Sequence, residues 1–152
     1  MKPLSENRKA HFDYQILETF EAGIALKGFE VKSIKSGKMN IAGSFVVPRA
    51  TSKGSAELFL MNTDIPPYQP NNIPKDYDAK QSHRLLLTMK EINYLLGKVR
   101  AEGLTIVPLK VYTKNSLVKI EIALVKSKKG KDKREVIRKR EVKRELGRTL
   151  KQ

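Results

Sequence analysis

The sequence predicts a mainly β fold: a small, closed antiparallel β-barrel with about three short helices, followed by a basic C-terminal tail. Short apolar runs separated by turn residues recur between Tyr14 and Val125, as they do in proteins built from short strands. Two segments in the same region have helical spacing. From Lys126 onward the composition changes, with thirteen of the 31 Lys and Arg but only four of the 16 Asp and Glu.

The first expected strand runs from Tyr14 to Leu26, with a bend or bulge at Gly23. The next segment, GFEVKSIK at Gly28–Lys35, brings three apolar residues within two turns and predicts a short helix. Gly37 supplies the left-handed conformation that commonly ends a helix.

A hairpin is predicted from Phe45–Val47 and Glu57–Met61, which are separated by the turn-like stretch Arg49–Ala56. The following stretch, Asn62–Ser82, contains four prolines and is expected to be a loop, because proline lacks a backbone donor. Whether this loop is functional or a plain surface excursion stays open. Leu85–Leu87 then returns to the core.

Thr88 and Glu91 form a Thr-x-x-Glu capping box, which predicts the start of a second helix. Gly103 is expected to end it. Four apolar residues follow the capping box at helical spacing: Ile92, Leu95, Leu96 and Val99.

The last hairpin is predicted from Leu104–Tyr112 and Leu117–Val125, joined by a basic turn at 113–116. Strands broken by short helices and ending in such a hairpin predict a barrel of the oligonucleotide-binding type, with one face and the loops free for RNA. We expect residues 1–125 to form this domain. Residues 126–152 are expected to form a tail that is disordered when free and helical when bound.

The formal charge of +15 over 152 residues predicts a polyanionic partner. Nucleic acid fits better than a membrane, because no apolar run approaches the ~20 residues that span a bilayer. The polar start of the chain has no secretory signal, so a cytoplasmic location is expected.

The sequence offers few residues for catalysis or metal binding. It has no cysteine, which excludes disulfides, thiolate metal sites and thiol nucleophiles. Neither His11 nor His83 has ligand-type spacing, so each is expected to be structural or to face RNA. No nucleophile with a base and no paired carboxylates are apparent, so we expect no enzyme, cofactor, metal or small-molecule substrate, with an unrecognised activity on RNA left open.

A basic surface with an interleaved aromatic is the main candidate for binding. Lys32 and Lys35 lie on the first predicted helix. The last hairpin adds further candidates: Lys110, Tyr112, Lys114 and Lys119. Such a surface holds folded RNA by phosphate contacts and by stacking on a splayed base. The alternative is that these lysines are ordinary solvated faces.

Six segments, in the same order along the chain, resemble the SsrA-binding protein family (small protein B): NRKA at 7–10, FEAGI at 20–24, GFEVKSI at 28–34, LLL at 85–87, VPLK at 107–110 and KDKR at 131–134. The resemblance implies an oligonucleotide-binding-type barrel with added helices and a disordered tail. It also implies that the protein binds the tRNA-like domain of transfer-messenger RNA and delivers it to stalled ribosomes.

The resemblance further implies that Glu21 and Leu86 lie on the surface that holds the tRNA-like domain, and we include the neighbouring Arg84. Glu21 would accept hydrogen bonds from a base edge or a ribose hydroxyl, or orient a nearby Lys or Arg, or be a solvated carboxylate. Thr88 is a weaker candidate, because the family often has Asn there and both residues cap helices.

For the tail, the resemblance implies that Asp132, Lys133 and Arg134 reach the small-subunit decoding centre and the mRNA channel. We expect the basic residues before them to join that contact: Lys128, Lys129 and Lys131. Many relatives have a histidine or another ring where this chain has Lys131, so charge replaces stacking here. Two alternatives stay open: a nonspecific basic tail, and a structural ribosomal or general RNA-binding protein without rescue specificity.

Overall fold

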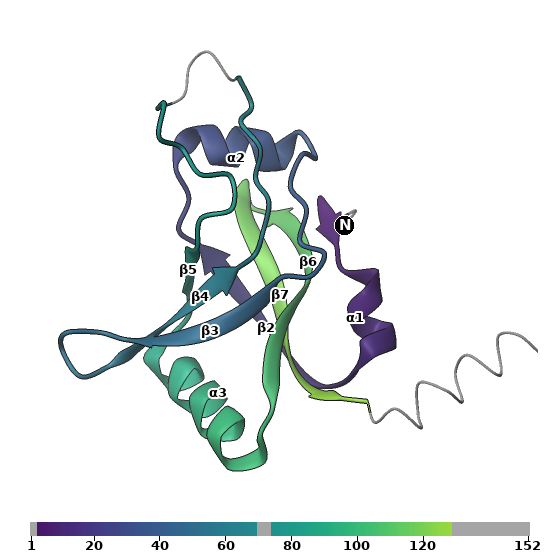
Figure 1. The fold of residues 1–152 in the computed structure, drawn as a ribbon, viewed down its shortest axis with the longest axis vertical. Coiled ribbons are helices and arrows are strands. Elements are labelled where there is room, and N and C mark those ends of the chain that lie inside the picture. The colour runs from purple at the N-terminus through teal and green to yellow at the C-terminus, as the bar shows by residue number, and fades with distance from the viewer. Residues whose placement is uncertain (1–2, 70–73, 129–152) are drawn as a thin grey trace, which may run out of the picture.

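The computed structural model describes residues 3–69 and 74–128, and it consists mainly of β-strands (Figure 1). The strands are β1 Ser5–Glu6, β2 Tyr14–Ile24, β3 Phe45–Ala50, β4 Ala56–Met61, β5 His83–Leu86, β6 Thr105–Lys114 and β7 Leu117–Ser127. The helices are α1 Arg8–Asp13, α2 Gly28–Lys35 and α3 Met89–Glu102.

The strands form a closed antiparallel barrel. Their order is β1-β6-β3-β4-β5-β2-β7, and a further pairing between β6 and β7 closes the ring. β1 lies outside this ring, and among the described strands it pairs with β6 alone. In Figure 1, α2 lies over one end of the barrel and α3 over the other, while α1 lies beside β6 and β7. The predicted fold class is confirmed.

The barrel interior holds the main hydrophobic core, made by alternate residues of the strands together with α2 and α3. On β7 the residues that the alternation predicts to be buried do face this core: Val118, Ile120, Ile122 and Leu124. Near its end β7 is buried on both faces, because Ala123 and Val125 pack under Ala10 of α1 in a second, smaller cluster. Helix α1 therefore covers an apolar patch that the barrel would otherwise expose to water.

Both predicted helices are present. α2 has the predicted bounds, and Gly37 follows it with a φ of 83°. Its buried face is more polar than its apolar residues suggest, because Glu30 and Ser33 are buried together with Ile34. α3 begins at the predicted capping box and ends at Gly103, which has a φ of 63°.

The hydrogen bonds of the Thr88 cap are expected to stabilise the folded protein. Its hydroxyl accepts a hydrogen bond from the Glu91 backbone N–H at 3.2 Å, and the Glu91 carboxylate accepts one from the Thr88 backbone N–H at 3.1 Å. We expect Thr88→Ala to lower the free energy of unfolding by about 1 kcal/mol, measured by urea denaturation. Thr88→Ser retains the hydroxyl and is the control. Equal stability of the two variants would contradict a capping role.

The N-terminal segment contains two elements that the sequence did not indicate, β1 and α1. β1 has two residues and α1 has six, and the N-cap of α1, Asn7, makes no side-chain capping bond. Elements this short show no measurable periodicity. Tertiary contacts hold them instead: the Asn7 backbone N–H donates to the Leu109 carbonyl at 2.8 Å, and its side-chain amide donates to the Pro108 carbonyl at 3.1 Å.

The predicted irregularity at Gly23 is wrong. The register of β2 shifts between Ile16 and Glu18, which leaves Leu17 as the extra residue. Gly23 instead pairs regularly with Lys119 on β7 and is also opposite Leu86 on β5. The glycine is needed for space, because a Cβ at this position would lie 3.2 Å from the Leu86 Cβ.

Two predicted boundaries in the C-terminal half also move. The turn of the last hairpin has two residues rather than four, because Asn115 and Ser116 both adopt positive φ angles of 52° and 66°. Two-residue turns of this kind match the right-handed twist of paired strands, so pairing continues to Lys114. At the other end β7 continues through Ser127, two residues past the predicted domain boundary.

The proline-containing segment 62–82 has no helix or named strand in its described part, as predicted. It is attached to the barrel by a bridge between Asp64 and Asn40 and by the Ser33 hydroxyl of α2, which donates to the Pro66 carbonyl at 2.5 Å. Within the described residues, no helix is long and apolar enough to cross a membrane.

Candidate nucleic-acid interface

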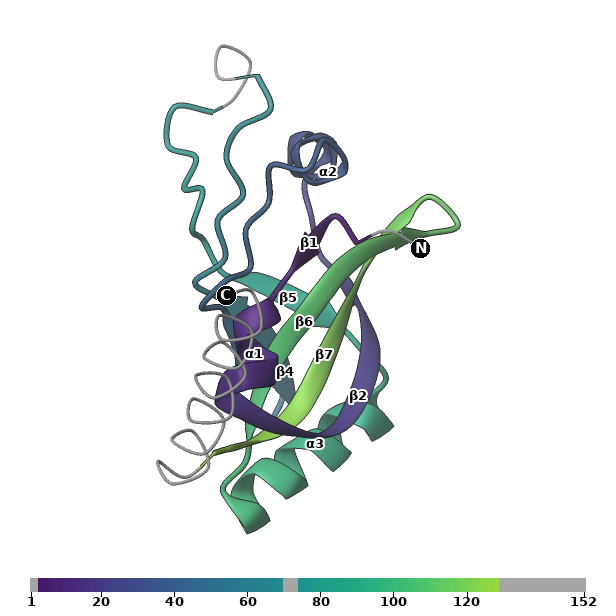
Figure 2. The same cartoon turned by 90° about the vertical axis from the view of Figure 1, so that its right-hand side faces the viewer.

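Three neighbouring strands bring most of the predicted binding residues of the last hairpin together with Glu21. In the register of the sheet, Glu21 of β2 is opposite Glu121 of β7, which is opposite Lys110 of β6. In the next outward-facing row, Lys119 of β7 lies between Gly23 and Tyr112. Figure 2 shows these three strands side by side on one side of the barrel. We call this region the Glu21 surface, defined by Glu21, Lys110, Tyr112, Lys114, Lys119 and Glu121.

Glu21 is held by two partners from β6. The Tyr112 hydroxyl donates to Glu21 Oε2 at 2.5 Å, and Lys114 Nζ lies 3.5 Å from Glu21 Oε1. The Tyr112 hydrogen bond and the nearby positive charges of Lys114 and Lys119 lower the pKa of the Glu21 carboxyl. Burial and the same hydrogen bond raise the pKa of the Tyr112 hydroxyl. The pair is therefore a carboxylate and a neutral phenol that donates to it.

The prediction that Tyr112 stacks on a base is at odds with its position in the structure. Its side chain is mostly covered, with the residue 8% exposed, and its hydroxyl is occupied by Glu21. Lys110 Nζ lies 5.9 Å from the centre of its ring and 4.0 Å from Glu121 Oε2. Tyr112 therefore holds Glu21 in position and lies beneath Lys110 Nζ. The exposed polar groups of this surface are the lysine and glutamate side chains.

An apolar hollow adjoins the Glu21 surface at the level of Gly23. Leu86 of β5 is 46% exposed and Leu117 of β7 is 59% exposed, and both line the hollow together with Lys119. The absence of a side chain at Gly23 leaves the hollow open. Leu86 therefore lies beside the Glu21 surface.

The remaining predicted residues lie around these two features. Lys35 of α2 donates from Nζ to the Ser116 carbonyl at 3.0 Å, which ties α2 to the hairpin turn, and Lys32 is exposed on the same helix. Arg84 points outward from β5 and pairs with Glu57 at 3.3 Å. Thr88 makes its described side-chain contacts in the α3 cap, so its evident role is structural.

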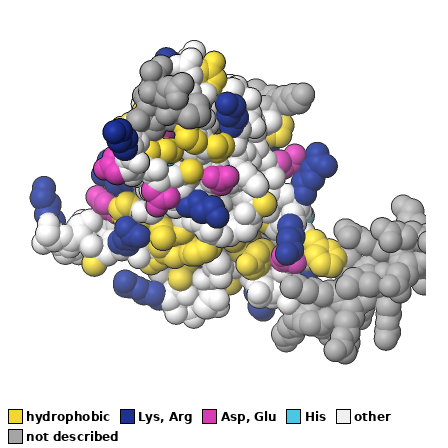
Figure 3. Space-filling view, turned by 45° about the horizontal axis from the view of Figure 1, so that its top comes forward, with side chains coloured by type: hydrophobic (Ala, Val, Ile, Leu, Met, Phe, Trp, Pro, Cys, Tyr) yellow, Lys and Arg dark blue, Asp and Glu magenta, His cyan; other side chains and the backbone are white. Residues whose placement is uncertain are grey.

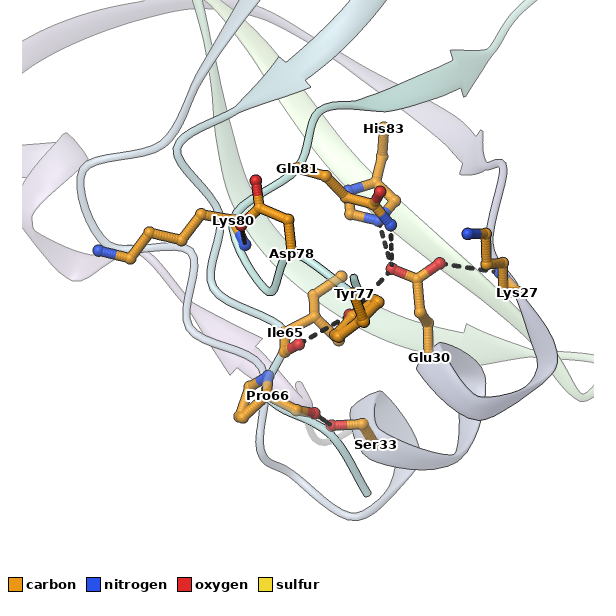
Figure 4. A network of polar contacts seen from close by, with 10 residues as sticks. All are labelled: Lys27, Glu30, Ser33, Ile65, Pro66, Tyr77, Asp78, Lys80, Gln81 and His83. Atoms are coloured by element: carbon orange, nitrogen blue, oxygen red, sulfur yellow. Dashed lines mark hydrogen bonds and ion pairs between the residues drawn. The ribbon is translucent and has the colours of Figure 1, made fainter. Parts of the chain in front are cut away.

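A buried polar network that sequence reasoning missed positions α2. Glu30 is 1% exposed, and its Oε2 lies 2.6 Å from Nε2 of His83, which is 4% exposed (Figure 4). The Tyr77 hydroxyl and the Gln81 amide donate to the same oxygen at 3.2 and 3.3 Å. The other oxygen accepts from the Lys27 backbone N–H at 2.9 Å. Helix α2, the proline-containing segment and β5 therefore meet at one carboxylate.

Glu30 is ionised in this network. Burial raises the pKa of its carboxyl, but the hydrogen bonds from the Lys27 backbone and His83, with the others, outweigh burial and lower it. Burial and the Glu30 charge raise the pKa of Tyr77, which stays a neutral donor. His83 Nδ1 is buried and has no hydrogen-bond partner among the described residues. A Glu and a His separated by fifty-three positions leave no local sequence signal.

The described residues contain no cluster of three or more His, Asp or Glu side chains that could hold a metal ion. The predicted tail contacts fall mostly outside the described residues: Lys129, Lys131, Asp132, Lys133 and Arg134. Lys128 is described, and it follows β7 beside α1, with its backbone N–H donating to the Asp13 carbonyl at 3.2 Å and its Nζ donating to the His11 carbonyl at 3.2 Å.

The closed antiparallel barrel and the lysine-rich Glu21 surface define a small basic β-barrel protein of the oligonucleotide-binding type. A family model described as SmpB protein matches residues 4–152. The chain belongs to the SmpB protein family.

Relatives and a solved structure agree with this assignment. The chain is 46% identical to an SsrA-binding protein of Trichodesmium erythraeum, over 99% of this chain and 94% of the relative. It is 47% identical to an SsrA-binding protein of Thermosipho melanesiensis, over 99% of each. A solved structure reported as "tmRNA-SmpB: a journey to the center of the bacterial ribosome" has 44% identity and a TM-score of 0.65, over 88% of this chain and 93% of that one.

Proposed function

We propose that this protein is an RNA-binding adaptor that binds the tRNA-like domain of transfer-messenger RNA and delivers it to stalled ribosomes for trans-translation. The observation that carries the proposal is the family match over residues 4–152, with relatives of nearly equal length that are named SsrA-binding proteins. The adaptor performs no catalysis and acts in the cytoplasm. It needs no cofactor, because its work is the joining of two RNA-containing partners.

The Glu21 surface supports this proposal because its lysines attract any RNA, while its carboxylate selects the RNA groups that can donate a hydrogen bond. Lys110, Lys114 and Lys119 attract the phosphate backbone of any RNA. Glu21 opposes close phosphate approach but accepts hydrogen bonds from a ribose 2′-hydroxyl or a base amino group. Because Tyr112 and Lys114 hold this carboxylate in place, it binds RNA only where a donor meets it. Leu86 and Leu117 add an apolar contact beside it.

The tail completes the adaptor. Thirteen of the chain's 31 Lys and Arg follow Val125, and the segment leaves the barrel at Lys128, beside α1 and away from the β6–β7 turn. We propose that Asp132, Lys133 and Arg134, with Lys129 and Lys131, occupy the decoding centre and the mRNA channel when no message fills them. A cationic segment is suited to an RNA-lined channel, where phosphates neutralise its charge.

The experiment that tests the proposal compares three RNAs across a salt series: transfer-messenger RNA, an ordinary tRNA and an unstructured RNA of equal length. Counterion release weakens all three complexes as salt rises. We expect transfer-messenger RNA to keep a preference over the unstructured RNA at high salt. Equal affinities and equal salt slopes would instead indicate a general RNA-binding protein.

The direction in which Glu21→Gln changes the affinity for RNA distinguishes the adaptor from a general RNA-binding protein. The variant gains one net positive charge and keeps an acceptor for Tyr112, so a general RNA binder would bind more tightly. An adaptor whose carboxylate accepts hydrogen bonds from RNA should bind the tRNA-like domain about tenfold more weakly, because bonds to charged groups contribute roughly 1.5–3 kcal/mol. Filter binding or fluorescence polarisation measures the change.

Glu121→Gln is the matched control for that experiment. Glu121 lies directly opposite Glu21 on the same surface and pairs with Lys110 at 4.0 Å. Its substitution changes the net charge by the same amount, and we expect unchanged or slightly tighter binding. If both variants weaken binding equally, the selective role of Glu21 is lost.

A further inference from the structure

A second exposed surface lies on β3 and β4, and we call it the Arg49 surface. It comprises Phe45, Val47, Arg49, Phe59 and Met61. On β4, Leu58 and Leu60 face the core with 0% exposure, so the alternation of the strand turns Phe59 and Met61 outward. In the β3–β4 register Phe45 is opposite Met61, and Val47 is opposite Phe59. Phe45 is 40% exposed.

Arg49 lies flat against this apolar surface. Its guanidinium carbon is 4.6 Å from the centre of the Phe59 ring, and its Nη2 lies 3.6 Å from the Met61 sulfur. None of the ion pairs between described residues involves Arg49. Lys110 and Lys114 differ in this respect, because each has a glutamate partner. Glu57 is opposite Arg49 in the β3–β4 register, but its described ion pair is with Arg84 at 3.3 Å. The guanidinium plane of Arg49 is therefore held against an aromatic ring and forms no ion pair among the described residues.

The Arg49 surface is separate from the Glu21 surface. In the ring β3 and β4 are neighbours, β5 lies between β4 and β2, and the strands of the Glu21 surface, β2, β7 and β6, follow. Figure 1 shows the β3–β4 hairpin in front and extending to the left, whereas β6, β7 and β2 face the viewer in Figure 2. Figure 3 shows hydrophobic side chains exposed between Lys and Arg side chains near the projecting hairpin.

We propose that the Arg49 surface binds an unpaired nucleotide of single-stranded RNA. The base stacks on the outer face of the Arg49 guanidinium, which Phe59 supports from below, and the positive charge of Arg49 attracts the adjacent phosphate. Guanidinium planes and aromatic rings are the groups on which proteins stack splayed bases. Arg84, which is opposite Phe59 on β5, lies at the edge of this surface and adds a second cation.

Three features favour RNA over another occupant. Without the tail, residues 1–125 still carry 18 Lys and Arg against 12 Asp and Glu, a net charge of +6 that favours a polyanion. The described cations at this surface, Arg49 and Arg84, outnumber its one paired carboxylate, Glu57. In barrels of the oligonucleotide-binding type, a face formed by neighbouring β-strands commonly binds single-stranded nucleic acid. The inference goes beyond the proposed adaptor function, because it requires neither the tRNA-like domain nor the tail.

The test uses full-length protein and a single-stranded adenosine octamer, with an abasic ribose-phosphate strand of equal length as the comparison. The NMR signals of the Phe59 ring protons and the Arg49 side-chain N–H report on the surface itself, even though the tail also attracts RNA. We expect upfield shifts with the octamer and none with the abasic strand. Unchanged signals at saturating octamer, or equal shifts with both strands, would overturn the proposal.

Arg49→Lys and Lys53→Gln separate stacking from charge. Arg49→Lys keeps the charge but removes the plane, so octamer binding measured at Phe59 should weaken about tenfold, as expected for the loss of one stacked base. Lys53→Gln removes a charge from the turn of the same hairpin and should weaken binding only slightly. The reverse ranking would show that charge alone acts here and would overturn the proposal.

Glu21→Gln distinguishes the failure of this inference from failure of the adaptor function. Shifts at Phe59 that persist in Glu21→Gln, while binding of the tRNA-like domain weakens, show two independent surfaces, as we expect. If the Phe59 shifts disappear together with binding to the Glu21 surface, the separate site does not exist, although the adaptor function stands. If the shifts persist while transfer-messenger RNA shows no preference, the Arg49 surface stands without the adaptor function.

Discussion

Deleting Lys131–Gln152 is expected to abolish ribosome rescue while leaving most of the affinity for the tRNA-like domain. All the contacts described for the Glu21 surface come from β2, β6 and β7, so the deletion leaves that surface complete. The deleted segment carries the decoding-centre residues that we propose. A reconstituted translation reaction on a message without a stop codon measures rescue as tagging of the nascent chain, and the tagged product should fall to background.

A scrambled tail is the control for the deletion. It has the same residues in a different order, so its charge and its nonspecific attraction to RNA are preserved. We expect the scrambled variant to bind RNA with the original salt dependence but to fail in rescue. Normal rescue by the scrambled tail would mean that residues 131–152 act only through their charge, which would reject a specific role for Asp132, Lys133 and Arg134.

Glu30→Ala is expected to have the largest effect on stability, with a loss of about 3–5 kcal/mol in the free energy of unfolding. The substitution removes the carboxylate that His83, Tyr77 and Gln81 share, and it leaves the buried Nε2 of His83 without this partner. It also removes the acceptor for the Lys27 backbone N–H at the start of α2. Urea denaturation followed by circular dichroism measures the loss.

Glu57→Ala is the matched control. It also removes a glutamate from an ion pair, but the side chains of Glu57 and Arg84 are 35% and 49% exposed. Exposed pairs contribute about 1 kcal/mol or less, so we expect a small change. If both substitutions cost the same, the buried network does not stabilise the attachment of α2.

The stabilisation by Glu30 should depend on pH. Its pKa is lowered in the folded protein, so its contribution is fully present above its unfolded value of about 4.5 and is lost as the pH falls through the lower, folded value. The stability difference between the native protein and Glu30→Ala should therefore be constant near neutral pH and shrink in acid. A difference that grows below pH 4.5 would contradict an ionised Glu30.

Local sequence patterns predicted the helices and strands that are determined by residues close together in the sequence. The Thr88–Glu91 capping box gave the start of α3, because both partners lie within one helical turn. The alternation in β7 gave its core-facing side. α2 was also predicted with correct bounds, but its buried face was not, because Glu30 is buried by partners from distant segments and not by its own neighbours.

The candidate site was predictable only in part. The resemblance and the charge pattern selected Glu21 and the lysines of the last hairpin, and the register of the sheet then brought them together. The role of Tyr112 was missed, because its hydroxyl partner lies ninety-one positions away. Arg49 gave no signal as an isolated arginine, since only strand pairing and alternation place it beside Phe59.

The fold class, the basic character of the protein, its hairpins and its family follow from the order of the residues, because hydrophobic alternation, turn residues, net charge and six ordered motifs are properties of the chain. Tertiary structure alone decided which charges are neutralised and which stay free. Barrel closure brings strands from distant positions within hydrogen-bonding distance, so Tyr112 reaches Glu21 and His83 reaches Glu30. Strand pairing likewise places the Arg49 guanidinium against the Phe59 ring.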